Sequence, residues 1–187
     1  AGARPYYDTA LAVKAGADVV VLDGMQGGTA ATQEVFIENV GQPTLACIRP
    51  AVDALQDLNM HREVQLIISG GIRNGADVAK AMALGADAVS IGSAAMIALG
   101  DNDPKWEKEY NKLGTRAGAY DDWHEGKDPA GISTQDPKLI KRFDPVKGGK
   151  RLSNYLKVMT LEAQTLARAC GKNDLRNLEP EDLCALT

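Results

Sequence analysis

Apolar and polar positions alternate in blocks along the first hundred residues, and these blocks predict strands separated by helices. Short apolar runs rich in β-branched residues are typical of parallel strands covered on both faces. They lie at residues 18–22, 65–68 and 88–91. Apolar positions three and four residues apart, with glycine or proline at the ends, predict helices. Those helices span residues 7–14, 50–58, 76–84 and 94–99, with Pro50 near the start of the second.

The same helix-to-strand joint, Gly-Ala-Asp, occurs at residues 16–18 and again at 85–87. Such a repeat indicates successive βα units and a parallel sheet. Open doubly wound sheets and (β/α)8 barrels share this order, but glycine turns after two consecutive final strands favour the barrel. Because a complete barrel takes about 250 residues, we predict an α/β fold that forms the C-terminal part of a TIM barrel. The other strands would lie upstream or on a partner.

Two glycine turns carry the first functional hypothesis. The strand at 65–68 ends in Ser69-Gly70-Gly71, and the strand at 88–91 ends in Gly92-Ser93. Bare backbone amides bind anions, and the last two strands of a barrel commonly hold a phosphate in this way. The alternative is that these glycines only make tight turns. Two such turns in succession favour phosphate binding.

The loop after the first strand, residues 23–32, is too rich in glycine to belong to the core. It contains Asp23, Gly27 and Gly28 and is expected on the same face as the phosphate turns, where barrel active sites are built. Asp23 has three possible roles: catalysis, orientation of a ligand hydroxyl, or capping of its own loop. The neighbouring glycines indicate a ligand contact as strongly as a cap.

The second half of the chain has a different character. We divide the chain into a barrel part at 1–100, a polar, loop-rich segment at 101–148, and a helical tail at 149–187. The tail has a helix at 150–169 and a last short helix that starts at Pro180. So long an irregular segment indicates a binding or covering role. It contains His124, which we interpret as a structural histidine because no second metal ligand stands near it.

Composition limits the classes of function. The formal net charge of -4 does not indicate the excess of basic residues that is typical of nucleic-acid-binding proteins. No apolar run of the 187 residues is long enough to cross a membrane. The three cysteines, Cys47, Cys170 and Cys184, lack metal-site or disulfide spacing. Their spacing predicts a reducing compartment, the cytoplasm.

Five segments resemble the FMN-binding domain of glutamate synthases. They are residues 23–29, 69–81, 83–92, 131–137 and 177–183. The resemblance covers nearly the whole chain and implies a (β/α)8 barrel that holds FMN. It implies flavin or 2-oxoacid contacts in the loop at 23–29, with Asp23, Gly27 and Gly28, and contacts to the FMN phosphate around Gly70, Gly71, Gly92 and Ser93. Ser69 and Arg73 are further cofactor-binding candidates. No catalytic acid or base can be assigned. Arg4 and Arg73 are the local candidates for holding a dicarboxylate, or are simply exposed arginines.

The chain departs from this family where the family carries the cysteines of an iron-sulfur cluster. Residues 123–131 match the segment Cys-His-x-x-x-Cys-Pro-x-Gly, but with Trp123 and Asp128 at the cysteine positions, and Asp101 stands at or near an earlier one. Clusters need thiolates, so we predict no iron-sulfur cluster on this chain. The cluster normally relays outside electrons, so its loss favours chemistry in which FMN returns the hydride that it takes.

That chemistry is found in the N-methylglutamate synthase branch of the family, which the chain resembles most. The resemblance then implies glutamate, methylamine or ammonia, and 2-oxoglutarate as small-molecule partners. It also implies amidotransferase-like and glycine-repeat-like partner subunits. A conventional glutamate synthase and a non-catalytic scaffold subunit remain as alternatives. An enzyme similar to IMP dehydrogenases is disfavoured, because the loop at 23–32 has no cysteine nucleophile.

Overall fold

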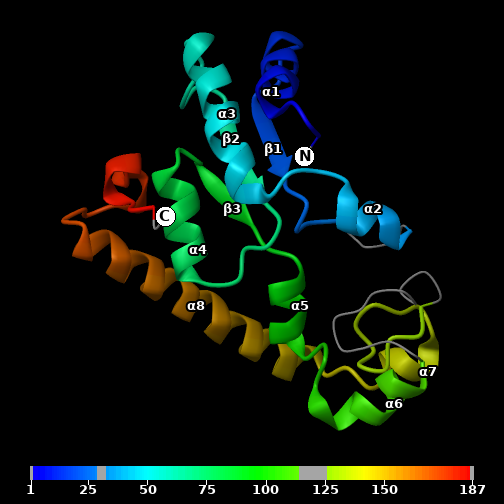
Figure 1. Ribbon diagram of the computed structural model, residues 1–187. Helices are drawn as coiled ribbons and strands as arrows, with labels where there is room; N and C mark the ends of the chain where they lie inside the picture. The colour runs from blue at the N-terminus through cyan, green and yellow to red at the C-terminus, as the bar shows by residue number, and fades with distance from the viewer. Residues whose placement is uncertain (1, 29–32, 114–125, 186–187) are drawn as a thin grey trace. The chain divides into compact units, whose positions relative to one another are not determined.

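The computed structural model describes residues 2–28, 33–113 and 126–185, which form an α/β structure (Figure 1). Its strands are β1 (Val19–Asp23), β2 (Gln65–Ser69) and β3 (Ala88–Ser90). Its α-helices are α1 (Pro5–Lys14), α2 (Glu34–Asn39), α3 (Thr44–Asp57), α4 (Gly75–Ala83), α5 (Ser93–Leu99), α6 (Glu107–Lys112), α7 (Pro137–Ile140) and α8 (Pro145–Ala169). Short 3₁₀ helices are η1 (Pro104–Trp106), η3 (Leu175–Asn177) and η4 (Pro180–Asp182).

The three strands form one parallel sheet in the order β1-β2-β3. Val19 pairs with Gln65 at the start of the first ladder, and Ser69 pairs with Ser90 at the end of the second. Sequential parallel neighbours joined by helices are the arrangement of consecutive units in a barrel wall. All three carboxyl ends therefore meet at one edge of the sheet, as the sequence predicts.

One face of the sheet carries the core. Leu22, Leu66 and Ile68 point to the helices and are almost fully buried. They pack in one apolar cluster with Val52 and Leu55 of α3 and with residues of α4 and the C-terminal segment. On this side α1 also packs against α3, as Figure 1 shows.

The opposite face of the sheet is open in the described part of the chain. Val19 and Val21 of β1 are 49% and 59% exposed, and Ala88 and Ser90 of β3 are also exposed. The expectation that both faces of the strands are covered is therefore not met. A barrel explains the difference, because its inner face is covered only when side chains from all its strands fill the interior.

Helix α3 corrects the predicted boundary at Pro50. The helix begins at Thr44, and Pro50 lies inside it rather than near its start. A proline removes one helical hydrogen bond and normally ends a helix. Here the buried positions Cys47, Ile48, Val52 and Leu55 continue one face through the proline, and burial of that face outweighs the lost bond.

The described residues divide into two compact units. The first holds residues 2–28, 38–91 and 158–185, and the second holds 33–37, 92–113 and 126–157. The first unit contains the sheet, and the second contains η1, α6, α7 and the start of α8. In the described residues, no helix combines the length and apolar character needed to span a bilayer.

Candidate functional site

The turn after β2 is the part of the first unit best suited to bind an anion. Gly70 and Gly71 have φ values of 99° and 76°, in the left-handed region that favours glycine. Within the described residues, the backbone amides of Gly70, Gly71 and Ile72 have no hydrogen-bond acceptor. Successive open amides in such a turn form a concave anion site. The turn thus offers the bare main-chain donors that the sequence predicts there.

The loop after β1 packs directly on this turn. The amide of Gly24 donates to the carbonyl of Ser69 at 3.1 Å. A Cβ atom at Gly70 would lie 2.9 Å from the amide nitrogen of Gly27, and one at Gly71 would lie 2.9 Å from Cβ of Gln26. Both glycines are therefore required by loop packing as well, so the tight-turn interpretation also has a structural basis.

Asp23 ends β1 and lies beneath its own loop. A Cβ atom at Gly27 would lie 2.1 Å from Oδ1 of Asp23, and this oxygen is buried. The carboxylate thus underlies the turn that follows it. Gly28, with a φ of 92°, has open space beside its Cα atom. The carboxylate lies where the loop-capping role considered above would place it.

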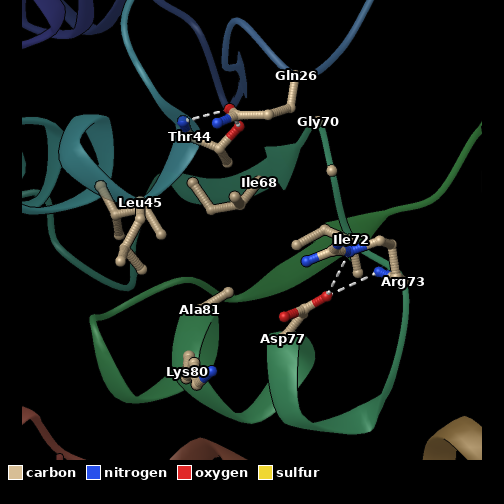
Figure 2. Close-up of a pocket in the computed structure, with 12 residues that line it drawn as sticks. Gln26, Thr44, Leu45, Ile68, Gly70, Ile72, Arg73, Asp77, Lys80 and Ala81 are labelled. Carbon is tan, nitrogen blue, oxygen red and sulfur yellow. Dashed lines mark hydrogen bonds and ion pairs between the residues drawn. The ribbon is translucent and has the colours of Figure 1, made fainter. Parts of the chain in front are cut away.

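A pocket of about 550 Å³ opens beside the glycine turn, between α3 and α4 (Figure 2). Its apolar lining comes from Leu45 and Ile48 of α3, Ile68 of β2, Ile72, and Ala81 of α4. Its polar lining comes from Gln26, Thr44, Gly70, Gly71, Arg73, Asp77 and Lys80. A pocket with an apolar body and a cationic, donor-rich rim suits an amphipathic anion.

The charged rim belongs to the start of α4. Asn74 caps the helix, since its side chain accepts from the amide of Asp77 at 2.9 Å. Asp77 in turn accepts from the amide of Arg73 at 3.0 Å, and its Oδ2 lies 3.6 Å from Nε of Arg73 (Figure 2). The Arg73 side chain is nevertheless 78% exposed. A largely exposed guanidinium at the rim of the pocket can bind an anion bidentately.

The first backbone amide of α4 already has a hydrogen-bond acceptor within the protein. Glu162 of α8 accepts from the amide of Gly75 at 2.6 Å. Negative charge at this helix end is thus supplied by the protein itself, which leaves the preceding amides of the turn, rather than the helix terminus, for a ligand.

The remaining predicted residues fall elsewhere. Gly92 precedes α5, and Ser93 is its first residue; both belong to the second unit. The structure therefore brings Asp23, Gly27, Ser69, Gly70, Gly71 and Arg73 together in the first unit, and Gly92 and Ser93 are described apart from them. His124 and Trp123 lie outside the described residues.

Asp101 and Asp128, which the sequence resemblance aligns at or near cluster cysteines, meet in the second unit. Asp101 and Asp128 each lie 2.9 Å from the hydroxyl oxygen of Tyr110. These contacts connect two described parts of the segment at 101–148, on either side of residues 114–125. Among the described residues, no group of three histidine, cysteine or acidic side chains is arranged to hold a metal ion.

Four polar residues of the pocket were missed in the sequence: Gln26, Thr44, Asp77 and Lys80. Gln26 and Thr44 are 18 positions apart, and no local pattern links them. Asp77 and Lys80 are ordinary first-turn and mid-helix residues of α4 by sequence. A signal for Asp77 existed, since it follows Arg73 at the four-residue step of a helical ion pair.

Comparison with known proteins gives a consistent family. Residues 2–104 and 119–173 match the conserved region in glutamate synthase. The chain is 84% identical over 186 residues to a glutamate synthase large subunit-like protein of Rhizobium meliloti, covering all of this chain and 42% of that protein. It is 41% identical to an archaeal NADPH glutamate synthase of Methanocaldococcus jannaschii, covering 87% and 29% respectively. The chain thus spans less than half the length of these relatives.

Solved structures agree on the fold. A flavocytochrome b2 variant with benzoylformate superimposes with a TM-score of 0.59 at 18% identity, covering 96% of this chain and 33% of that one. A second variant, with pyruvate bound, gives a TM-score of 0.58. The prediction of an α/β chain forming part of a (β/α)8 barrel is confirmed.

Proposed function

The chain belongs to the glutamate synthase family, and from that premise we propose that it is the FMN-binding part of an N-methylglutamate synthase (methylamine–glutamate N-methyltransferase). Glutamate would be oxidised to 2-iminoglutarate, methylamine would displace ammonia, and reduction would give N-methylglutamate. The observation that carries the FMN part is the row of open amides at Gly70, Gly71 and Ile72 beside Arg73 and an amphipathic pocket.

The residues of the chain fit the phosphate end of FMN. The open amides and the Arg73 guanidinium supply hydrogen-bond donors, and the Lys80 ammonium adds positive charge at the rim. We extend the proposed contacts to Asp23, Gly27, Gly28, Ser69, Gly92 and Ser93, as the sequence predicts. When bound, FMN supplies the hydride transfer, and the protein contributes binding, orientation and exclusion of water.

The choice of an amine-exchanging enzyme depends on the second unit. By the resemblance, Trp123 and Asp128 stand at two cluster cysteine positions and Asp101 at or near a third, and iron-sulfur clusters need thiolates. An exchange reaction needs no outside reductant, because the hydride taken from glutamate is returned to the methylated imine. We also propose amidotransferase-like and glycine-repeat-like partner subunits and a cytoplasmic location.

The flavin spectrum tests this function. The purified protein that contains this chain, assembled with its partners, should be yellow, and anaerobic glutamate should bleach it. Methylamine should then yield N-methylglutamate and ammonia without added reductant. A colourless protein would favour the scaffold alternative. Glutamate formation from ammonia and 2-oxoglutarate that requires a reductant, with no use of methylamine, would favour a conventional glutamate synthase.

Arg73→Ala tests the phosphate contact. Loss of an exposed guanidinium from an anion site should weaken FMN binding about tenfold or more, as measured by fluorescence titration of the apoprotein. Arg49→Ala is the control, because Arg49 pairs with Asp53 at 3.0 Å on α3 and does not line the pocket. Equal affinity of the two variants would remove Arg73 from the site.

A further inference from the structure

The carboxamide of Gln26 is held in one orientation at the edge of the pocket. Its Oε1 accepts from the backbone amide of Thr44 at 2.8 Å and from the Thr44 hydroxyl at 2.9 Å (Figure 2). A backbone N–H only donates, so the atom that faces it must be the oxygen. The carboxamide cannot be turned round without placing two donors against each other.

The nitrogen of the same carboxamide is left for a ligand. Gln26 lines the pocket, and its Nε2 has no acceptor among the described residues. The stem of Gln26 rests on Gly71, whose absent side chain gives it room. Two N–H donors are therefore fixed beside the open amides of the glycine turn.

The rest of the polar lining selects the kind of ligand. Arg73 and Lys80 carry positive charge, and the one acidic residue of the lining, Asp77, is engaged by the amide and Nε of Arg73. Donors and cations thus face the space that Gln26 reaches. A ligand oxygen that accepts hydrogen bonds and carries negative charge fits this lining.

We propose that Gln26 is a ligand-binding residue whose Nε2 donates to an anionic oxygen of the bound molecule, and that Thr44 is its positioning residue. This inference rests on the proposed function and deepens it. The anionic oxygen belongs either to the phosphate of FMN or to a carboxylate of the substrate. Both share the chemistry that Gln26 recognises, and the experiment separates them.

Gln26→Glu is the sharpest variant. The glutamate has the same shape, and one carboxylate oxygen can still accept from both donors of Thr44, so the loop should stay docked. The second oxygen replaces the donor by a negative acceptor. If the ligand oxygen is the phosphate, the dissociation constant of FMN should rise about tenfold or more. If it is a carboxylate, the KM for glutamate should rise instead, with FMN affinity unchanged.

Gln56→Glu is the matched control, because Gln56 is exposed on α3 outside the pocket and gains the same charge. It should leave FMN affinity and KM unchanged. Circular dichroism melting should show both variants within about 2 °C of the wild type, since surface changes have small effects.

The positioning role of Thr44 is tested by combining its variants with Gln26→Glu. Thr44→Val removes the hydroxyl and keeps the shape, so it should reproduce part of the loss, and Thr44→Ser should restore it. In the Gln26→Glu background, Thr44→Val should cost no further ligand affinity, because Thr44 acts on the ligand through the side chain at position 26. Its second contact, from the hydroxyl to the carbonyl of Ser69 at 3.4 Å, should affect stability alone. A merely structural Thr44 would give additive losses.

The two hypotheses fail separately. If the wild type binds FMN and Gln26→Glu matches it in both FMN affinity and KM, the role of Gln26 is overturned and the proposed function stands. If the wild type binds no FMN, the proposed function fails. Gln26 is then judged by calorimetry with inorganic phosphate and 2-oxoglutarate, and binding of neither, or binding that Gln26→Glu leaves unchanged, overturns its role too.

Discussion

Gly75→Ala is expected to lower the free energy of unfolding by about 3 kcal/mol or more, because α8 leaves no space for a side chain there. An added Cβ atom would lie 2.4 Å from the carbonyl oxygen of Met159 and 2.5 Å from the amide nitrogen of Ala163. Both are backbone atoms of a helix, so α8 would have to shift. The shift would also break the 2.6 Å hydrogen bond from Gly75 to Glu162. Thermal and urea unfolding measure the effect.

Gly149→Ala provides the matched control for this prediction. Gly149 lies in the same helix α8, and a Cβ atom there would meet nothing within 4 Å. Replacing a helical glycine by alanine in open space should stabilise the protein by about 0.5–1 kcal/mol. If both variants changed stability equally, the close contact of α4 with α8 would not have the importance given to it here.

The strands, the glycine turns and α4 could be predicted because their signals are local. The signals for β2, its turn and α4 all lie within about twenty residues. They are a β-branched run, Gly70 and Gly71 after it, Asp77 in the first turn of the helix, and Gly85 after its end. The structure places β2 at Gln65–Ser69 and α4 at Gly75–Ala83, within one residue of the prediction.

Three helix starts in the second unit have a local sequence signal that the hydrophobic pattern does not include. Aspartate followed by proline occurs at 103–104, 136–137 and 144–145, at the starts of η1, α7 and α8. In each pair, the aspartate side chain accepts a backbone amide of the first turn, and proline suits the first helical position. The segment treated as loop-rich therefore contains short helices, and α8 begins five residues before the predicted start.

The site itself could be predicted only in part. The anion-binding turn follows from glycine spacing, but the pairing of Gln26 with Thr44 depends on two loops meeting across the sheet edge. Contacts between residues far apart in sequence arise from tertiary packing, which periodicity does not encode. The same is true of Asp101 and Asp128, which are 27 positions apart by residue number and share the hydroxyl of Tyr110.

That shared hydroxyl requires an extra proton. Tyr110 has one hydroxyl hydrogen but lies 2.9 Å from an oxygen of each aspartate, so both contacts are hydrogen bonds only if one carboxyl is protonated. Asp128 accepts from the backbone amides of Ala130, Ile132 and Ser133. Asp101 is 7% exposed, and its burial raises the pKa of its carboxyl above 3.8. We therefore expect Asp101, rather than Asp128, to hold the proton.

The nearby charges recorded in the described residues do not reverse this assignment. Arg142 pairs with Glu109 at 2.6 Å, and Arg151 lies 3.6 Å from Asp103, so these cations are engaged by other carboxylates. The charge of Asp128 also raises the pKa of Asp101, and the hydrogen bond from Tyr110 opposes the shift without cancelling it. Burial, and then the two neighbouring aspartates, raise the pKa of Tyr110 as well, so the phenol stays protonated.

Stability of the second unit should consequently fall as pH rises. A carboxyl whose pKa is raised by folding stabilises the folded state at pH values below its unfolded pKa, and this contribution is lost as pH rises through the raised pKa. Tyr110→Phe removes both hydrogen bonds and should cost about 1–3 kcal/mol at acidic pH, and less once Asp101 is ionised. Thermal unfolding between pH 4 and pH 8 measures both quantities.

Asp101→Asn separates this titration from packing. Its carboxamide has no proton to lose, so the fall in melting temperature with rising pH should become smaller than in the wild type. Asp53→Asn serves as the control, since Asp53 is an exposed partner of Arg49 in the first unit and should leave that fall unchanged. An Asp101→Asn protein with the full wild-type pH dependence would show that the proton resides elsewhere. One of the two Tyr110 contacts would then be a hydrogen bond, and the other would bring two oxygens together with no hydrogen between them. Tyr110→Phe would remove that repulsion instead of destabilising the protein.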